Sequence, residues 1–318
     1  MRLSWISIFL LFIFTSCSSQ ENLLLEKKAV VNLNNEPFYR DMTEEVNGSV
    51  IWKKEFEYIN DIDIFDITYK SDGLKIKGFL VTPKKEGNYP VIIFNRGGSF
   101  DFGALDLSLV SYWMGKLAAQ GYVVIGSQYR GNAGSEGKEE FGGDDVNDVL
   151  NLIPLIDELA YADSNRIGMY GWSRGGMMTY LALPKSNRIK AAIVGGAVAD
   201  FRLLEADRPG FIDYIPDTEN IEEALDQRSP VLWANKFSKT TPILLLHGNS
   251  DWRVKSEHSL KMALEFEKYR IPYRLIIYEG GNHGIFEHRI EVDQEIMNWF
   301  NKYLKQDTPL PNMEYHGR

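Results

Sequence analysis

The sequence predicts an α/β fold with a mostly parallel, doubly wound sheet of eight strands. Short apolar runs alternate with stretches of helical periodicity over most of the chain. The central runs are apolar at nearly every position, as expected for parallel strands that are covered on both faces. A serine flanked by glycines stands at 171–175, between one such strand and a helix. We therefore expect chemically active side chains at the carboxyl ends of the strands.

Residues 1–16 have the pattern of a secretory signal peptide. Arg2 precedes an apolar stretch, 6–14, that is too short to cross a bilayer as a helix. Small residues then precede Cys17, the one cysteine of the chain. This resembles the signal of a bacterial lipoprotein, and the alternative is an ordinary secretory signal with an incidental cysteine. We expect an exported protein, periplasmic or surface-facing, held at a membrane by acyl chains on Cys17.

The composition is that of a globular protein, with 44% hydrophobic and 25% charged residues. The net charge of −9 and the lack of a basic cluster argue against a nucleic-acid partner. A single cysteine excludes a disulfide within the chain. We expect no cofactor and no metal, and a small peptide or ester as the substrate.

The ordered domain is expected over 57–306, after a lipidated tether and polar arm at 17–56 with room for one helix. Period-two alternation predicts strands at 62–69 and 74–81, joined by a turn at 71–73 into a hairpin at the sheet edge.

The remaining elements alternate along the chain. Strands are expected at 90–94, 122–126, 166–170, 189–194, 243–246 and 274–278, and helices at 107–120, 144–159 (bent at Pro154), 176–183, 256–269 and 288–304. An acidic, aromatic and proline-rich insertion at about 197–240 interrupts the alternation, and it is expected to form a helical cap over the strand ends. Residues 307–318 form a C-terminal tail.

Ser173 is the predicted nucleophile, in the strand–turn–helix setting of the α/β-hydrolase nucleophile elbow. A serine needs a base, and the order of this fold places a histidine last. His283 follows the last strand among glycines and is the expected base. Asp251, in the loop after 243–246, is the expected acid, with Asp207 and Asp213 of the cap as weaker alternatives.

An oxyanion hole requires two backbone donors near the nucleophile. The N–H of Arg174, directly after the serine, is one candidate. The second is expected from the loop Arg96-Gly97-Gly98, which follows a buried strand.

Several motifs occur together and in order. They are Tyr69-x-Ser71-Asp72-Gly73, Arg96-Gly97-Gly98, Tyr129-Arg130-Gly131, 171–176, His247-Gly248-x-x-Asp251 and His283-Gly284. Over about 57–306 this set resembles the catalytic domain of the prolyl oligopeptidase family of serine peptidases. The resemblance implies Ser173 as nucleophile, Asp251 as acid and His283 as base. Two features depart from the family: the chain has no room for an N-terminal β-propeller, and Arg96 stands where many members have His or Tyr.

Three functions follow from these residues. The first is a serine peptidase on short peptides, which needs an acidic anchor for a substrate amino terminus. Glu205, Asp207 and Asp213 in the cap are the candidates, and Trp172 is a further candidate for substrate contact. The second is a carboxylesterase on small or sugar esters, which the same triad serves equally well. The third, a binding protein without catalysis, is disfavoured by the intact triad.

Overall fold

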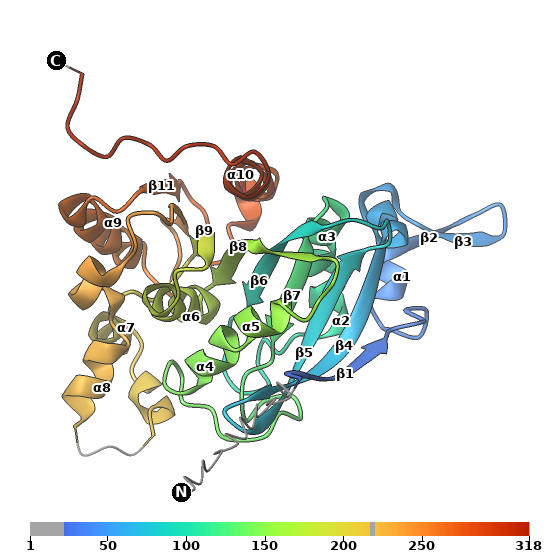
Figure 1. The fold of residues 1–318 in the computed structure, drawn as a ribbon, viewed down its shortest axis with the longest axis horizontal. Coiled ribbons are helices and arrows are strands. Elements are labelled where there is room, and N and C mark those ends of the chain that lie inside the picture. Colours follow the sequence, from blue (N-terminus) through green and yellow to red (C-terminus); the bar gives the residue numbers. More distant parts are fainter. Residues whose placement is uncertain (1–21, 217–219, 318) are drawn as a thin grey trace, which may run out of the picture.

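The computed structural model describes residues 22–216 and 220–317, and the predicted signal peptide and Cys17 lie outside the described residues. One nine-stranded sheet forms the centre of the molecule (Figure 1). Its strands are β1 (Leu24–Ala29), β4 (Ile62–Ser71), β5 (Leu74–Pro83), β6 (Tyr89–Asn95), β7 (Val123–Ser127), β8 (Ala162–Trp172), β9 (Ile189–Gly195), β10 (Ile243–Gly248) and β11 (Tyr273–Tyr278). Their order is β1-β4-β5-β7-β6-β8-β9-β10-β11. The five pairings from β7 to β11 are parallel, and the other three are antiparallel.

The eight predicted strands are all present, and the predicted fold class is confirmed. The ninth strand, β1, is an addition from the arm, so ordered structure begins well before residue 57 and the β4–β5 hairpin is not at the edge. Sequence reasoning missed β1 because it is an exposed edge strand of sequence LLEKKA, with charged side chains toward solvent. The arm also forms helix α1 (Tyr39–Met42), a separate hairpin of β2 (Thr43–Val46) and β3 (Ser49–Trp52), and the 3-10 helix η1 (Lys54–Asp61).

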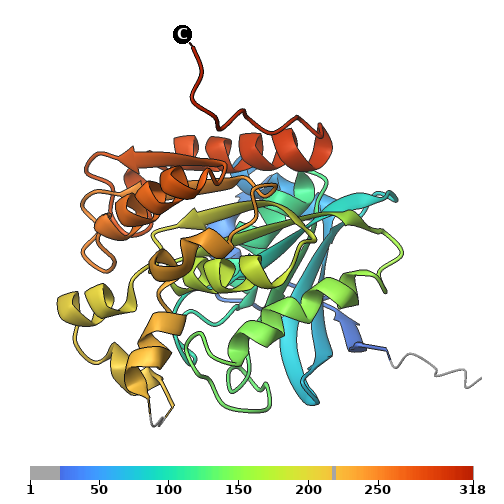
Figure 2. The ribbon, with the colours of Figure 1, turned by 60° about the vertical axis from the view of Figure 1, so that its left-hand side comes forward.

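Both faces of the sheet are buried, as the apolar runs require. In β6 the alternating residues Val91 and Ile93 pack into one core, whereas Ile92 and Phe94 pack into the other. Successive side chains of a strand point to opposite faces, so a run without polar residues supplies both cores. Figure 2 shows helix α10 on one side of the sheet and α4, α5 and α6 on the other.

The helices follow the predicted segments, with bounds that differ by a few residues. They are α2 (Leu107–Leu109), η2 (Val110–Met114), α3 (Gly115–Ala119), α4 (Asp145–Leu150), α5 (Leu152–Ile156), α6 (Arg174–Ala182), α9 (Glu257–Tyr269), α10 (Arg289–Phe300) and η7 (Asn301–Lys305), with the short 3-10 turns η3 (Leu183–Lys185) and η6 (Phe286–His288). The predicted bend divides α4 from α5 at Asn151, because Pro154 has no N–H to donate to the carbonyl of Leu150. Within the described residues no helix is long and apolar enough to span a bilayer.

The predicted cap is helical. It contains α7 (Phe201–Asp207), η4 (Phe211–Tyr214), α8 (Ile221–Gln227) and η5 (Pro230–Lys236), and it enters directly beyond the carboxyl end of β9. The segment from 307 to 317 contains no helix or strand.

Two of the motifs, 69–73 and 129–131, are joined by a partly buried ion-pair network. Arg130 forms ion pairs with Asp148 at 2.8 Å and with Asp72 at 2.7 Å, and Ser71 donates a hydrogen bond to Asp148. The residues of the β4–β5 turn and of the loop after β7 are therefore held against α4. These contacts hold the loop that carries Glu139, which pairs with Arg174 in the site described next.

Candidate active site

Ser173 occupies a strained turn between β8 and α6. Its backbone lies at φ 58° and ψ −124°, a conformation that costs of order 1–3 kcal/mol for a residue other than glycine. The N–H of Ser173 donates to the carbonyl of Gly195 at 2.8 Å, which holds the turn against β9. Strain that the surrounding structure supports in this way is typical of functional sites.

The two glycines of the pentapeptide are required by close contacts. A Cβ on Gly175 would lie 1.9 Å from the carbonyl oxygen of Asn95, and one on Gly171 would lie 2.0 Å from the carbonyl oxygen of Gly175. No side chain fits at either position. The predicted steric reason for the glycine–serine–glycine spacing is therefore present in the structure.

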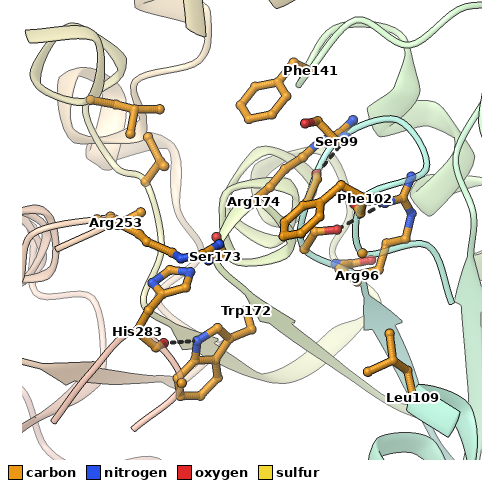
Figure 3. A pocket seen from close by; sticks show the side chains of 18 of the residues that line it. Arg96, Ser99, Phe102, Leu109, Phe141, Trp172, Ser173, Arg174, Arg253 and His283 are labelled. Carbon is orange, nitrogen blue, oxygen red and sulfur yellow. Dashed lines mark hydrogen bonds between the residues drawn. The ribbon is translucent and has the colours of Figure 1, made fainter. Parts of the chain in front are cut away.

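Asp251 and His283 meet although 32 residues separate them. Each follows one of the neighbouring parallel strands β10 and β11, so both loops emerge at the same sheet edge. Nδ1 of His283 lies 2.7 Å from Oδ2 of Asp251. Figure 3 shows the imidazole of His283 beside Ser173 in the pocket. The three predicted triad residues thus come together, and the cap alternatives for the acid do not take part.

The Asp251 carboxylate is buried and held from several sides. Its Oδ1 accepts the N–H groups of Arg253 and Val254 at 2.8 and 3.0 Å. Burial alone would raise its pKa, but hydrogen bonds from His247 and His283 outweigh this and lower the pKa below the usual range. Asp251 is therefore ionised whenever His283 is required to carry a proton.

Trp172, the predicted substrate contact, also positions the base. Its Nε1–H donates to the carbonyl oxygen of His283 at 2.6 Å (Figure 3), and its side chain lines the same pocket as Ser173. One residue therefore links the strand that carries the nucleophile to the loop that carries the base.

The predicted oxyanion loop lies against the elbow. A Cβ on Gly97 would stand 3.4 Å from Cβ of Ser173, so the backbone of Gly97 passes directly beside the nucleophile. Within the described residues, the N–H groups of Gly97 and Gly98 have no hydrogen-bond acceptor. Arg174 is the first residue of α6, and its N–H has no partner in the helix. These N–H groups are thus without an internal acceptor beside the nucleophile, and their role as oxyanion donors stays a prediction.

Arg96 contributes differently from the other residues of that loop. Its buried guanidinium donates to the carbonyl oxygens of Gln128, Gly97 and Phe100 at 2.9–3.1 Å. Burial, with the nearby charge of Arg174, lowers the pKa of Arg96 to about 10. The side chain thus organises its own loop and does not donate to an oxyanion.

The Arg174 side chain is buried beneath the elbow between two carboxylates. Its Nη atoms lie 2.7 Å from Glu139 and 2.6 Å from Asp145, and Nη1 also donates to the carbonyl of Gly98 at 3.0 Å. Glu139 in turn accepts the N–H of Phe100 at 2.9 Å. Arg174 is therefore connected to the oxyanion loop in two ways. It donates directly to the carbonyl of Gly98, and through Glu139 it is linked to the N–H of Phe100.

A cavity of about 690 Å³ opens beside Ser173. None of the three predicted acidic anchors lines it. Glu205 accepts the N–H groups of Gly210 and Ile212, Asp207 pairs with Lys255, and Asp213 is exposed. The structure therefore does not support the prediction of an acidic anchor in the cap.

Two charged lining residues were missed by the sequence reasoning, Arg208 of the cap and Arg253 of the acid loop. Arg253 stands two residues after Asp251, and this proximity is a signal that could have identified it. No such signal marks Arg208, because no residue of the predicted triad lies near it in the sequence.

Comparisons with known proteins agree on one family. The prolyl oligopeptidase family model matches residues 107–307. The chain is 28% identical over 228 residues to the uncharacterized peptidase YtmA of Bacillus subtilis, covering 70% of this chain and 86% of that protein. It is 26% identical over 260 residues to the acylamino-acid-releasing enzyme of Mus musculus, covering 73% of this chain and 34% of that enzyme.

The structural comparison gives a similar result. An acylaminoacyl peptidase in complex with Z-Gly-Gly-Phe-chloromethyl ketone has a TM-score of 0.69 and 25% identity, covering 80% of this chain and 43% of that one. This chain thus spans less than half the length of that peptidase and about a third of the mouse enzyme.

Proposed function

This chain belongs to the prolyl oligopeptidase family of serine peptidases, and from that premise we propose that it hydrolyses short peptides whose amino terminus is blocked. The observation that carries the proposal is the pocket beside Ser173, whose described lining contains no Asp or Glu. A free ammonium group would find no counter-ion there, whereas an acylated amino terminus needs none. The names of the acylamino-acid-releasing enzyme and the acylaminoacyl peptidase among the relatives point to the same class of substrate.

The reaction proceeds through an acyl-enzyme. His283 removes the proton of the Ser173 hydroxyl as the oxygen attacks the scissile carbonyl, and Asp251 stabilises the imidazolium that forms. The N–H of Arg174, with that of Gly97 or Gly98, binds the oxyanion. His283 then protonates the leaving amine, and in a second round it activates the water that releases the acyl group and restores Ser173.

The test compares N-acetylated and free aminoacyl p-nitroanilides of the same sequence. We expect cleavage of the N-acetylated series, and Ser173→Ala should lower turnover by roughly four to six orders of magnitude while the protein folds normally. A preference for the free amino series would overturn the blocked-substrate proposal. Cleavage of short-chain p-nitrophenyl esters, with no cleavage of the anilides, would indicate a carboxylesterase and not a peptidase.

We also propose that Cys17 is a lipid attachment site. Support comes from the sequence alone, in which a short apolar stretch and small residues precede this cysteine. The enzyme would then act outside the cytoplasm, at a membrane surface.

A further inference from the structure

The pocket beside Ser173 has a positive lining. Apart from His283, its ionisable basic side chains are four arginines, and its described lining contains no carboxylate. The chain as a whole carries a net charge of −9, so the charge of the pocket lining is opposite in sign to that of the chain. Whether this charge recruits a ligand depends on which arginines already have partners in the protein.

Two of the four are satisfied internally. Arg174 lies between the carboxylates of Glu139 and Asp145, at 2.7 and 2.6 Å. Arg96 donates to the carbonyl oxygens of its own loop and of Gln128. These two side chains hold the catalytic loops, and they are not available to a substrate.

Arg208 and Arg253 remain. They approach from different elements, Arg208 from the end of α7 and Arg253 from the loop after β10. The guanidinium of each lies 5.3 Å from the ring of Trp252, and Nη1 of Arg208 donates to the carbonyl of Arg253 at 3.1 Å. Among the described residues, neither guanidinium forms an ion pair with a carboxylate. Figure 3 shows the Arg253 side chain extending toward Ser173 and His283.

The surroundings of this arginine pair increase its attraction for an anion. Arg208 stacks on Phe211 at 4.9 Å, and Arg253 lies 5.9 Å from Phe102, so both cations rest against aromatic surface. Burial, together with the charge of Arg253, lowers the pKa of Arg208, and the more distant carboxylate of Asp251 offsets this only in part. Two like charges in such a place repel each other, and a bound anion relieves the repulsion. A carboxylate matches the planar guanidinium with two parallel hydrogen bonds.

We propose that Arg208 and Arg253 bind a carboxylate of the substrate, so that the enzyme prefers short blocked peptides that carry negative charge. This inference rests on the proposed function, because it concerns the occupant of the same pocket. The carboxylate can come from an acidic acyl group on the amino terminus or from the free carboxyl end of the leaving part. The bond that is cleaved is the same in both cases.

Two matched substrate pairs distinguish these sources. The first compares N-succinyl- with N-butanoyl-Ala-Phe p-nitroanilide, which differ by a carboxylate at the acyl end. The second compares N-acetyl-Phe-Ala-Ala with its C-terminal amide. We expect one pair to show a preference of about ten- to hundredfold in kcat/KM for the charged member, mainly through KM. A ratio near one in both pairs would overturn the inference.

Arginine variants link the preference to these side chains. Arg208→Gln and Arg253→Gln should each bring the ratio of the charged to the neutral substrate toward one. Lys255→Gln removes a nearby cation that pairs with Asp207 outside the pocket lining, and it should keep the ratio of the unaltered enzyme. A ratio that persists in both arginine variants, or that falls equally in Lys255→Gln, would contradict the assignment.

The outcome also separates this inference from the function on which it rests. If Ser173-dependent cleavage occurs without any preference for charged substrates, the proposed peptidase function is supported and the proposed carboxylate site is refuted. If no substrate is cleaved, calorimetric binding of N-succinyl-phenylalanine amide and of N-acetyl-Phe-Ala-Ala to the Ser173→Ala protein decides the question. Binding of either ligand that weakens at least tenfold with Arg208→Gln supports the site, and absence of binding by both overturns it.

Discussion

Glu139 is expected to control the rate of reaction although it lies under the elbow and outside the pocket lining. Its carboxylate pairs with Arg174 at 2.7 Å and accepts the N–H of Phe100 at 2.9 Å, so it connects the nucleophile turn to the oxyanion loop. Glu139→Gln keeps the shape of the side chain and removes the charge. Arg174 then keeps one carboxylate partner, that of Asp145.

The size of both effects follows from these contacts. Breaking a buried ion pair by deleting one partner lowers the free energy of unfolding by about 3–5 kcal/mol. Because glutamine still accepts a hydrogen bond, we expect Glu139→Gln to lower it by about 2–3 kcal/mol. Removal of one oxyanion donor typically costs about 10²–10³ in kcat, and a displaced donor should cost about 10–100-fold. KM should change little, because the oxyanion forms only in the transition state.

The assay combines steady-state kinetics on an N-acetylated anilide with thermal unfolding. Glu140→Gln is the matched control, since it removes the same charge from the adjacent residue, whose carboxylate accepts the N–H of Asp144. A Glu139→Gln enzyme that is destabilised but keeps the kcat of the control would refute the positioning role.

Two further predictions concern stability and location. Burial, aided by repulsion from His247, lowers the pKa of His258 from 6.5 to about 4. The unfolded chain therefore binds an extra proton between these values, and the free energy of unfolding should fall by about 3 kcal/mol as the pH drops from 6.5 to 4. His258→Asn retains an acceptor for the N–H of Ala199 and should flatten this slope in denaturant titrations; an unchanged slope would exclude His258 as its source. Cys17→Ser should move the protein from the membrane to the soluble fraction on cell fractionation, and continued membrane association would contradict lipidation at this residue.

The sequence by itself was enough to predict the candidate catalytic residues of this protein. The nucleophile elbow can be recognised in the sequence at 171–175 because only glycine fits at Gly171 and Gly175. A Cβ at either position would clash with backbone atoms around Ser173, whose φ is 58°. The positions of Asp251 and His283 follow from strand order, since the carboxyl ends of parallel strands meet at one edge. Eight strands were predictable for a similar local reason, whereas β1 was not, because an exposed edge strand carries no apolar pattern.

The charge of the pocket was decided only by the tertiary structure. The cap sequence is acidic, yet none of its described carboxylates lines the pocket. Glu205 accepts local backbone N–H groups and Asp207 pairs with Lys255, whereas Arg208 is the cap side chain with a charge that lines the pocket. Its neighbour Arg253 comes from a different element, 45 residues farther along the chain. Which ionised side chains find partners depends on distances between segments remote in sequence, and no local pattern encodes those distances. The family could therefore be inferred from local sequence, and the preferred charge of the substrate only from the fold.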